Sequence, residues 1–151
     1  MIFTNYVDTG KVIYTYHFYI VVENFVPGGR ESTQSASASL CADEQGRFWD
    51  YHDILYANWN GENGGAFADP RLVRFAEELG LDIEAFNTCF EQGRYKGRIQ
   101  TDMAAGQALG VSGTPSIFVN DQQVLNATDP RYLPTYEDIA AAIEAALNPA
   151  P

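Results

Sequence analysis

Hydrophobic positions follow a strand-like pattern near both ends of the chain. Residues 11–22 read KVIYTYHFYIVV, a β-branched and aromatic run that is largely apolar on both alternating faces. Such a run is typical of a strand buried on both faces of an α/β sheet. Residues 116–120 predict a second strand, and Asn120-Asp121 predicts a hairpin turn into a returning strand over residues 122–125.

Between these strands, apolar residues recur at helical spacing from about residue 32 to residue 109. Glycine or an exposed loop separates the successive helices, and a further helix runs to about Leu147 near the C-terminus. The predicted N-caps are Ser32 or Thr33, Asp69 followed by Pro70, Asp82, and Thr135, which forms a capping-box variant with Asp138. The order is therefore strand, helical block, strand, returning strand and helix.

The helix that begins near Arg47 carries an aromatic face, formed by Phe48, Trp49, His52, Leu55, Tyr56 and Trp59. Trp49, Tyr56 and Trp59 could line a ligand groove, but their spacing is more typical of core packing. His52 is expected to be a packed or half-buried structural residue. The neighbouring Asp50 and Asp53 could suggest a general base, although carboxylates on a helix usually form a solvated face.

Composition narrows the possible partners. The chain has 151 residues, of which 46% are hydrophobic, and this length suits one domain with a sizeable core. Its net charge of −11 argues against nucleic acid as a partner. No apolar run approaches the roughly 20 residues that cross a bilayer, so we expect no membrane insertion. The start of the chain, MIFTNYVDTGK, does not resemble a signal peptide.

Three stretches resemble the DsbA-like family of thioredoxin-fold proteins: SLCADEQGRFWDYHDILYAN, FADPRLVRFAEELGLDIEAFNTCFEQGRY and GQALGVSGTPSIFVND. The resemblance implies an α/β, thioredoxin-like fold with an α-helical insertion. It predicts a single domain over residues 1–151, with the insertion at about 32–109 and thioredoxin parts at about 6–24 and 111–147.

The same resemblance implies a substrate-binding role for Thr114 and Pro115. In the family this proline is cis at the head of a strand, where it faces the active-site dithiol. The expected partners are proteins or peptides that carry thiols or disulfides, docked as an added strand. The family usually works outside the cytoplasm, where disulfides persist.

The chain departs from the family pattern because it has no C-x-x-C motif, so no catalytic residue is assigned. We expect the first strand and the start of the catalytic helix to lie before Met1, which would leave apolar sheet edges and favour a homo-oligomer. The predicted function is a DsbA-family thiol–disulfide oxidoreductase homologue that is inactive as a dithiol oxidase in this form. The alternatives are a non-catalytic peptide-binding or assembly module, or a relative of glutathione transferases and isomerases.

The only two cysteines, Cys41 and Cys89, match neither catalytic position of the family. Both lie on the inward stripes of predicted helices, and they are candidates for a structural disulfide of the kind that some relatives have, or for two buried free thiols. A redox-active role is disfavoured, because a widely spaced pair cannot exchange as a vicinal dithiol does. The only histidines, His17 and His52, do not form a metal-ligand spacing with them. We therefore predict neither a metal site nor a cofactor.

Overall fold

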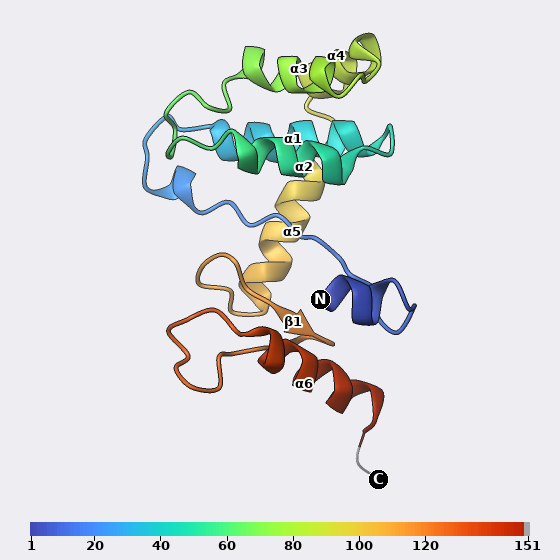
Figure 1. The fold of residues 1–151 in the computed structure, drawn as a ribbon. Helices are drawn as coiled ribbons and strands as arrows, with labels where there is room; N and C mark the ends of the chain where they lie inside the picture. The colour runs from blue at the N-terminus through green and yellow to red at the C-terminus, as the bar shows by residue number, and fades with distance from the viewer. Residues whose placement is uncertain (150–151) are drawn as a thin grey trace. The chain divides into compact units, whose positions relative to one another are not determined.

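The computed structural model describes residues 1–149 and divides into two compact units. Unit 1 consists of Met1–His17 together with the C-terminal part of the chain from Gln107, and unit 2 is Phe18–Gly106. Figure 1 shows the elements of both units along the chain. The prediction of one domain with an insertion at about residues 32–109 stays a prediction.

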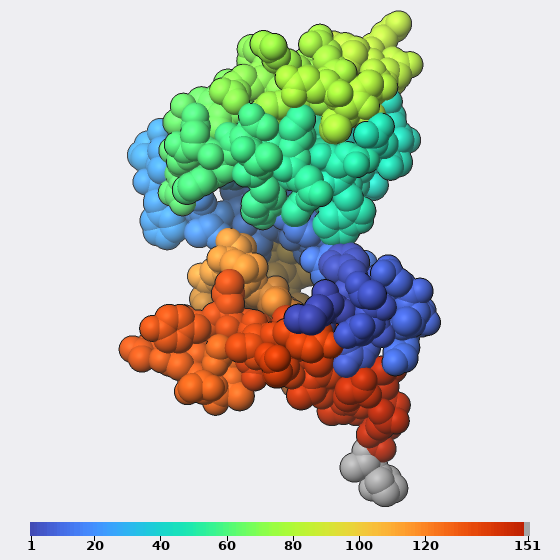
Figure 2. Space-filling view, viewed as in Figure 1, coloured from blue at the N-terminus to red at the C-terminus, as the bar shows by residue number. Residues whose placement is uncertain are grey.

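Unit 2 is helical. Its elements are a short 3-10 turn, η2 (Val22–Asn24), and the helices α1 (Glu31–Asp43), α2 (Phe48–Ala57), α3 (Asp69–Glu78), α4 (Ile83–Glu91) and most of α5 (Lys96–Ala108). α1 and α2 lie side by side, and α3 and α4 pack on them as a second layer (Figure 1). In the space-filling view, the cyan to yellow-green atoms of these four helices pack closely together (Figure 2). The predicted helical block is confirmed.

The core of unit 2 lies between these four helices. Its largest fully buried side chains are Tyr51, Phe86, Leu72, Cys41 and Cys89. The Tyr51 hydroxyl donates a hydrogen bond of 2.7 Å to the Leu72 carbonyl oxygen, so its polar end is paired inside the core. Leu72 of α3 and Phe86 of α4 are fully buried, so the apolar residues that recur at helical spacing on these two helices face the core.

The predicted inward face of α2 is right for Leu55 and wrong for its three largest aromatic residues. Trp49, Tyr56 and Trp59 are 44%, 68% and 62% exposed, whereas Tyr51 is fully buried. Ile54 and Leu55, which pack against the core, follow Tyr51 at intervals of three and four residues. The helix is thus rotated so that this shorter apolar stripe meets α1 and α3, and the larger aromatic side chains point away from the core.

The strand predicted over residues 11–22 is also wrong, because this segment has no regular structure up to the turn η2. A strand is held by hydrogen bonds to a neighbouring strand. Here two alternate backbone N–H groups bond to side chains of α5 instead. Phe18 donates to Asp102 Oδ2 at 3.2 Å, and Ile20 donates to Met103 Sδ at 2.8 Å.

Unit 1 contains a π-helical turn, η1 (Phe3–Val7), the strands β1 (Phe118–Val119) and β2 (Gln122–Gln123), and α6 (Tyr136–Leu147). The two strands form an antiparallel hairpin, and α6 packs against β1. Asn5 Nδ2 donates a hydrogen bond of 2.8 Å to the Tyr136 hydroxyl, which ties η1 to α6. The helices and this small sheet are consistent with the α/β, thioredoxin-like fold that the resemblance implies.

The helix caps follow the predictions in part. Asp82 Oδ1 accepts the Ala85 amide at 3.0 Å, and Thr135 and Asp138 form the predicted capping box. The caps predicted at Ser32 or Thr33 and at Asp69 are wrong, since α1 begins at Glu31 and α3 begins at Asp69 itself. The side chain of Glu31, the first residue of α1, contacts a neighbouring loop, because its carboxylate accepts hydrogen bonds from the Gly65 and Phe67 amides.

Candidate functional site

The Thr114–Pro115 step lies at an exposed bend before β1. Its peptide bond is cis, which is the isomer that the resemblance implies, and both side chains are exposed. Among residues 1–149, neither the amide nor the carbonyl of Thr114 takes part in a hydrogen bond. The bend therefore presents a donor and an acceptor of the main chain to solvent, which is what an extended peptide needs in order to pair with it.

The hairpin that follows the bend has a tight, two-residue turn. Phe118 pairs with Gln123 and Val119 with Gln122, and a further bond of 2.8 Å runs from the Val124 amide to the Ile117 carbonyl. The turn residues Asn120 and Asp121 have φ angles of 47° and 63°, as a type I′ turn requires. The predicted turn is confirmed, and the regular part of each strand is shorter than predicted.

The two cysteines lie in unit 2, on α1 and α4, where they form a disulfide bond. The Cα atoms of Cys41 and Cys89 are 5.8 Å apart, and the residues are only 1% and 0% exposed. Exchange of a disulfide requires a thiolate to reach one of its sulfur atoms. A pair that is closed off from solvent on all sides is suited to holding two helices together.

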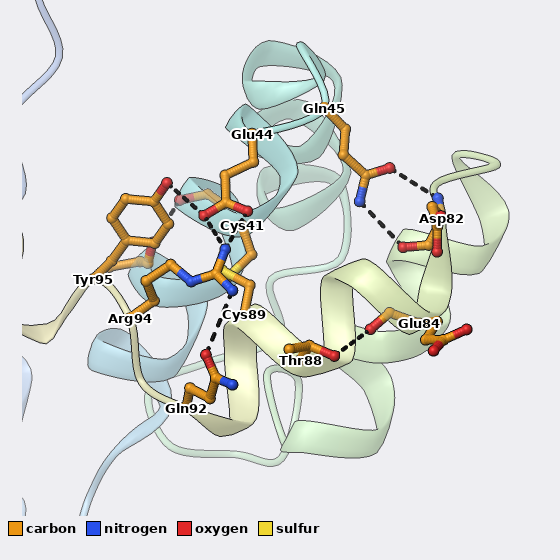
Figure 3. The surroundings of a disulfide bond; sticks show 12 residues. Cys41, Glu44, Gln45, Asp82, Glu84, Thr88, Cys89, Gln92, Arg94 and Tyr95 are labelled. Atoms are coloured by element: carbon orange, nitrogen blue, oxygen red, sulfur yellow. Dashed lines mark hydrogen bonds and ion pairs between the residues drawn. A yellow bond between two sulfur atoms is a disulfide. The ribbon is translucent and has the colours of Figure 1, made fainter.

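Polar contacts on the surface bracket this disulfide (Figure 3). The Arg94 guanidinium donates to both carboxylate oxygens of Glu44, at 2.8 and 2.7 Å, and the Tyr95 hydroxyl donates to Oε1 of Glu44 at 2.8 Å. Nearby, the side chain of Gln45 exchanges two hydrogen bonds with the backbone of Asp82, at 3.1 and 2.8 Å. Both sets of contacts join the end of α1 to the segment that contains α4.

These contacts shift two pKa values. Hydrogen bonds from Arg94 and then Tyr95 hold the pKa of Glu44 below its usual range. Burial, followed by the hydrogen bond to Glu44, raises the pKa of Tyr95 to about 12. In the core, burial raises the pKa of Tyr51 well above that of an ordinary tyrosine. At neutral pH the Glu44 carboxyl is therefore ionised, and the Tyr95 and Tyr51 hydroxyls are neutral.

The aromatic face of α2 is a connected cluster on the exterior of unit 2. The ring of His52 lies 5.4 Å from that of Trp49 and 4.6 Å from that of Tyr56. The His52 side chain is 24% exposed, as predicted for a half-buried structural residue, and its Nδ1 lies 3.0 Å from Asp53 Oδ1. Asp50 pairs with Arg47. The side chains of Asp50 and Asp53 are 55% and 82% exposed, as expected for a solvated helix face.

Sequence reasoning missed Tyr51 and the trio Glu44, Arg94 and Tyr95. The larger aromatic residues of the same helix indicated an inward face without Tyr51, although the spacing of Tyr51 to Ile54 and Leu55 is that of one helical stripe. The pairing of Glu44 with Arg94, 50 residues later, has no local signal. Over residues 1–149, no three His, Cys, Asp or Glu side chains gather closely enough to hold a metal ion.

The described helices include none with the length and apolar content needed to cross a bilayer. A thioredoxin family model matches residues 1–145 of the chain, and hence both units. The chain belongs to the thioredoxin family. The predicted relationship to thioredoxin-fold thiol–disulfide oxidoreductases is thereby confirmed.

Two kinds of relative share this thioredoxin-family sequence. A protein of Bacillus subtilis named disulfide bond formation protein D is 22% identical over 146 residues, covering 95% of this chain and 61% of its own length. A Bacillus anthracis protein with the name probable disulfide bond formation protein D is 27% identical over 119 residues, covering 76% of this chain and 52% of its own length. A Salinispora tropica protein named Na(+)/H(+) antiporter NhaA 3 is 38% identical over 89 residues.

The match to the Salinispora protein covers 59% of this thioredoxin-family chain and only 13% of the antiporter. The chain thus spans about an eighth of that relative and between half and two thirds of the Bacillus relatives. No solved structure gives a significant match.

Proposed function

We propose that this chain is a DsbA-like thiol–disulfide oxidoreductase homologue that docks protein or peptide substrates at Thr114 and Pro115. We further propose that these 151 residues do not catalyse dithiol–disulfide exchange, because their only cysteines are held in a buried disulfide. The observation that carries the docking role is the exposed Thr114 backbone, whose amide and carbonyl are unpaired among the described residues.

The position of Thr114 supports pairing with an extended peptide. The residue lies four positions before β1, in the segment that leads directly into the hairpin. Main-chain pairing at a strand edge gives affinity that depends little on the peptide's sequence. This suits substrates that share a thiol or disulfide and differ elsewhere, and the Bacillus relatives are named as disulfide bond formation proteins.

The proposed lack of exchange activity follows from the state of the cysteines. A catalytic dithiol needs an accessible thiolate with a lowered pKa and a partner thiol close in sequence. Cys41 and Cys89 are 48 positions apart and are at most 1% exposed. The bonded pair also supports an oxidising compartment, since structural disulfides persist there.

Two measurements test the proposal. In an insulin-reduction assay with dithiothreitol, the purified chain should add nothing to the rate of dithiothreitol alone, and substantial turnover would contradict the proposed inactivity. For docking, a capped eight-residue peptide with one central cysteine is titrated while backbone amide shifts are followed by NMR. Shifts should centre on residues 112–118.

A pair of variants separates backbone docking from side-chain contact. Thr114→Ala keeps the amide and should bind the peptide as the wild type does. Thr114→Pro removes the amide donor and should weaken binding by about five-fold, the value of one hydrogen bond of about 1 kcal/mol. Equal binding by both variants would show that the Thr114 amide takes no part.

A non-catalytic peptide-binding or assembly module is the second candidate, favoured by exposed apolar residues in the loop that follows β2. Leu125, Tyr132 and Leu133 are 51%, 68% and 56% exposed. The loop is ordered by Asn126, which accepts the Thr128 and Asp129 amides and donates to the Leu133 carbonyl. The position of the NMR shifts distinguishes the candidates: docking at Thr114 should shift residues 112–118, whereas binding by the assembly module should shift residues 125–133.

Association of two copies is a separate part of the proposal. Ile13 is 93% exposed in a run that has strand-forming character but forms no strand. Exposed strand-forming segments tend to pair with another chain. We therefore expect a homodimer in which residues 11–17 of each copy take part.

A further inference from the structure

Unit 2 contains a second candidate site, a cavity of about 260 Å³ that none of the proposals above uses. One wall is a single face of α1 and its N-cap, formed by Arg30, Gln34 and Ser37 at intervals of four and three residues. The other walls include Asp69 at the start of α3, Phe90 near the end of α4 and Lys96 at the start of α5.

Ser37 is a largely buried residue whose hydroxyl has no partner among residues 1–149 and opens onto the cavity. Two nearby serines of α1 satisfy their hydroxyls locally: Ser35 donates to the Ser32 carbonyl at 3.0 Å and Ser39 to the Ala36 carbonyl at 2.9 Å. Ser37 is 4% exposed, yet its hydroxyl makes no hydrogen bond within residues 1–149. Among the described residues, the buried side-chain polar atom that lacks a partner is Asn63 Nδ2, so the Ser37 hydroxyl keeps contact with the solvent of the cavity and can donate to a ligand there.

The charges that line the cavity are only partly paired. Both oxygens of Asp69 are used, by Arg30 at 2.8 Å and by the side-chain amide of Gln34 at 3.0 Å. Lys96 makes no ion pair with any described residue, including the exposed carboxylate of Glu91, the remaining charged group of the lining. The cavity therefore has one cation available for an incoming group.

The chain makes room for this lysine. At Gly93, a Cβ atom would lie 2.6 Å from Cε and 3.1 Å from Nζ of Lys96, so a larger residue would displace the lysine side chain. The φ angle of Gly93 is 57°, which also favours glycine. The Lys96 side chain thus lies close to Gly93, which also lines the cavity.

We propose that this cavity binds a small organic carboxylate with an apolar body. Ser37 and Lys96 would donate hydrogen bonds to the carboxylate, and Phe90 would contact the apolar part. The volume is slightly below the roughly 300 Å³ at which sites for drug-sized ligands begin, so the ligand must be small. This inference does not depend on substrate docking at Thr114.

The test uses 3-phenylpropionate as the probe and the full chain as the protein. Backbone amide shifts in an NMR titration should saturate and centre on residues 34–37 and 90–97. The uncharged analogue 3-phenylpropionamide should bind at least about three-fold more weakly, as expected for the loss of one exposed ion pair. Ser37→Ala should weaken carboxylate binding by about ten-fold, since it removes a hydrogen bond to a charged group.

Matched variants guard against effects on folding. Ser39→Ala changes an equally buried serine of the same helix, and Lys11→Gln removes the one other lysine of the chain. Neither should alter the dissociation constant, whereas Lys96→Gln should raise it by about three-fold. The proposal is overturned if the shifts do not saturate, if the amide binds as tightly as the carboxylate, or if Ser37→Ala and Lys96→Gln bind as the wild type does. Shifts centred instead on residues 112–118 would also overturn it.

Discussion

The Arg94 guanidinium donates from one nitrogen to both oxygens of the Glu44 carboxylate. Arg94 lies five residues after Cys89, and Glu44 lies three residues after Cys41. An ion pair on the surface thus lies directly over a buried covalent link between the same two segments. The link and the ion pair contribute to stability by different routes, and they can be tested separately.

Loss of the disulfide should destabilise unit 2. The bond closes a loop of 48 residues, and in the chain-entropy model such a loop stabilises the folded state by about 4 kcal/mol. We expect the Cys41→Ala/Cys89→Ala variant to lose about that much in a urea unfolding experiment. Wild type measured in dithiothreitol should approach the variant once the bond is reduced. Equal stability of oxidised and reduced wild type would show that the bond contributes nothing.

The Glu44–Arg94 ion pair should give a stability contribution that depends on pH. The pKa of Glu44 is lowered in the folded state, so its contribution is complete above the ordinary glutamate pKa of about 4.3. It is lost as the pH falls through the lower folded-state value. We expect Glu44→Gln to be less stable than wild type by up to about 1 kcal/mol at pH 7.

Urea unfolding of both proteins between pH 7 and pH 3 checks this expectation, and their difference should shrink at the acid end. Glu77→Gln serves as the control, because Glu77 is exposed and forms no ion pair with a described residue. A difference that stays constant over the whole pH range would exclude the carboxylate charge as its cause.

Removal of the Tyr51 hydroxyl should destabilise the core. It leaves the Leu72 carbonyl without its side-chain donor inside unit 2. We expect Tyr51→Phe to cost about 1–2 kcal/mol in the free energy of unfolding. Tyr56→Phe on the same helix is the matched control, since Tyr56 is 68% exposed, and it should change stability by less than about 0.5 kcal/mol. Similar losses for both variants would mean that helix packing, and not the buried hydrogen bond, is responsible.

A charge at Ile13 should reduce the proposed self-association. Ile13→Asp places a carboxylate in the exposed segment where we expect two copies to meet, and like charges would then face each other. Light scattering after size exclusion should show a dimer for wild type and a larger monomer fraction for the variant. Leu147→Asp, an exposed apolar position on α6, should leave the dimer intact. A wild-type chain that runs as a folded monomer would contradict the proposal.

Local signals predicted much of the helical structure. Asp82 caps α4, Thr135 and Asp138 form a capping box, and Asn120-Asp121 makes the hairpin turn. Each of these features depends on residues within a few positions of one another, so the sequence carries it directly. The inward positions of Cys41 and Cys89 also followed from helical spacing, although their pairing did not.

The errors arose where the outcome depends on distant partners. Residues 11–22 have the composition of a strand, but the amides of Phe18 and Ile20 bond to Asp102 and Met103, more than 80 positions later. On α2, the residue buried is Tyr51 instead of the bulkier Trp49, because the positions of α1 and α3 decide which face is covered. Intrinsic strand or helix propensity cannot predict either result, since both backbone pairing and side-chain burial depend on which segments lie next to the residue.

The sequence by itself thus determined the caps that begin α4 and α6, the turn of the hairpin and the inward positions of the two cysteines, because these features follow from backbone preferences and short-range periodicity. The tertiary structure alone decided that Cys41 and Cys89 are bonded, that Glu44 meets Arg94, and that Ser37 faces a cavity without a partner. Those outcomes require segments far apart in the chain to meet, and only the packing of the helices brings them together.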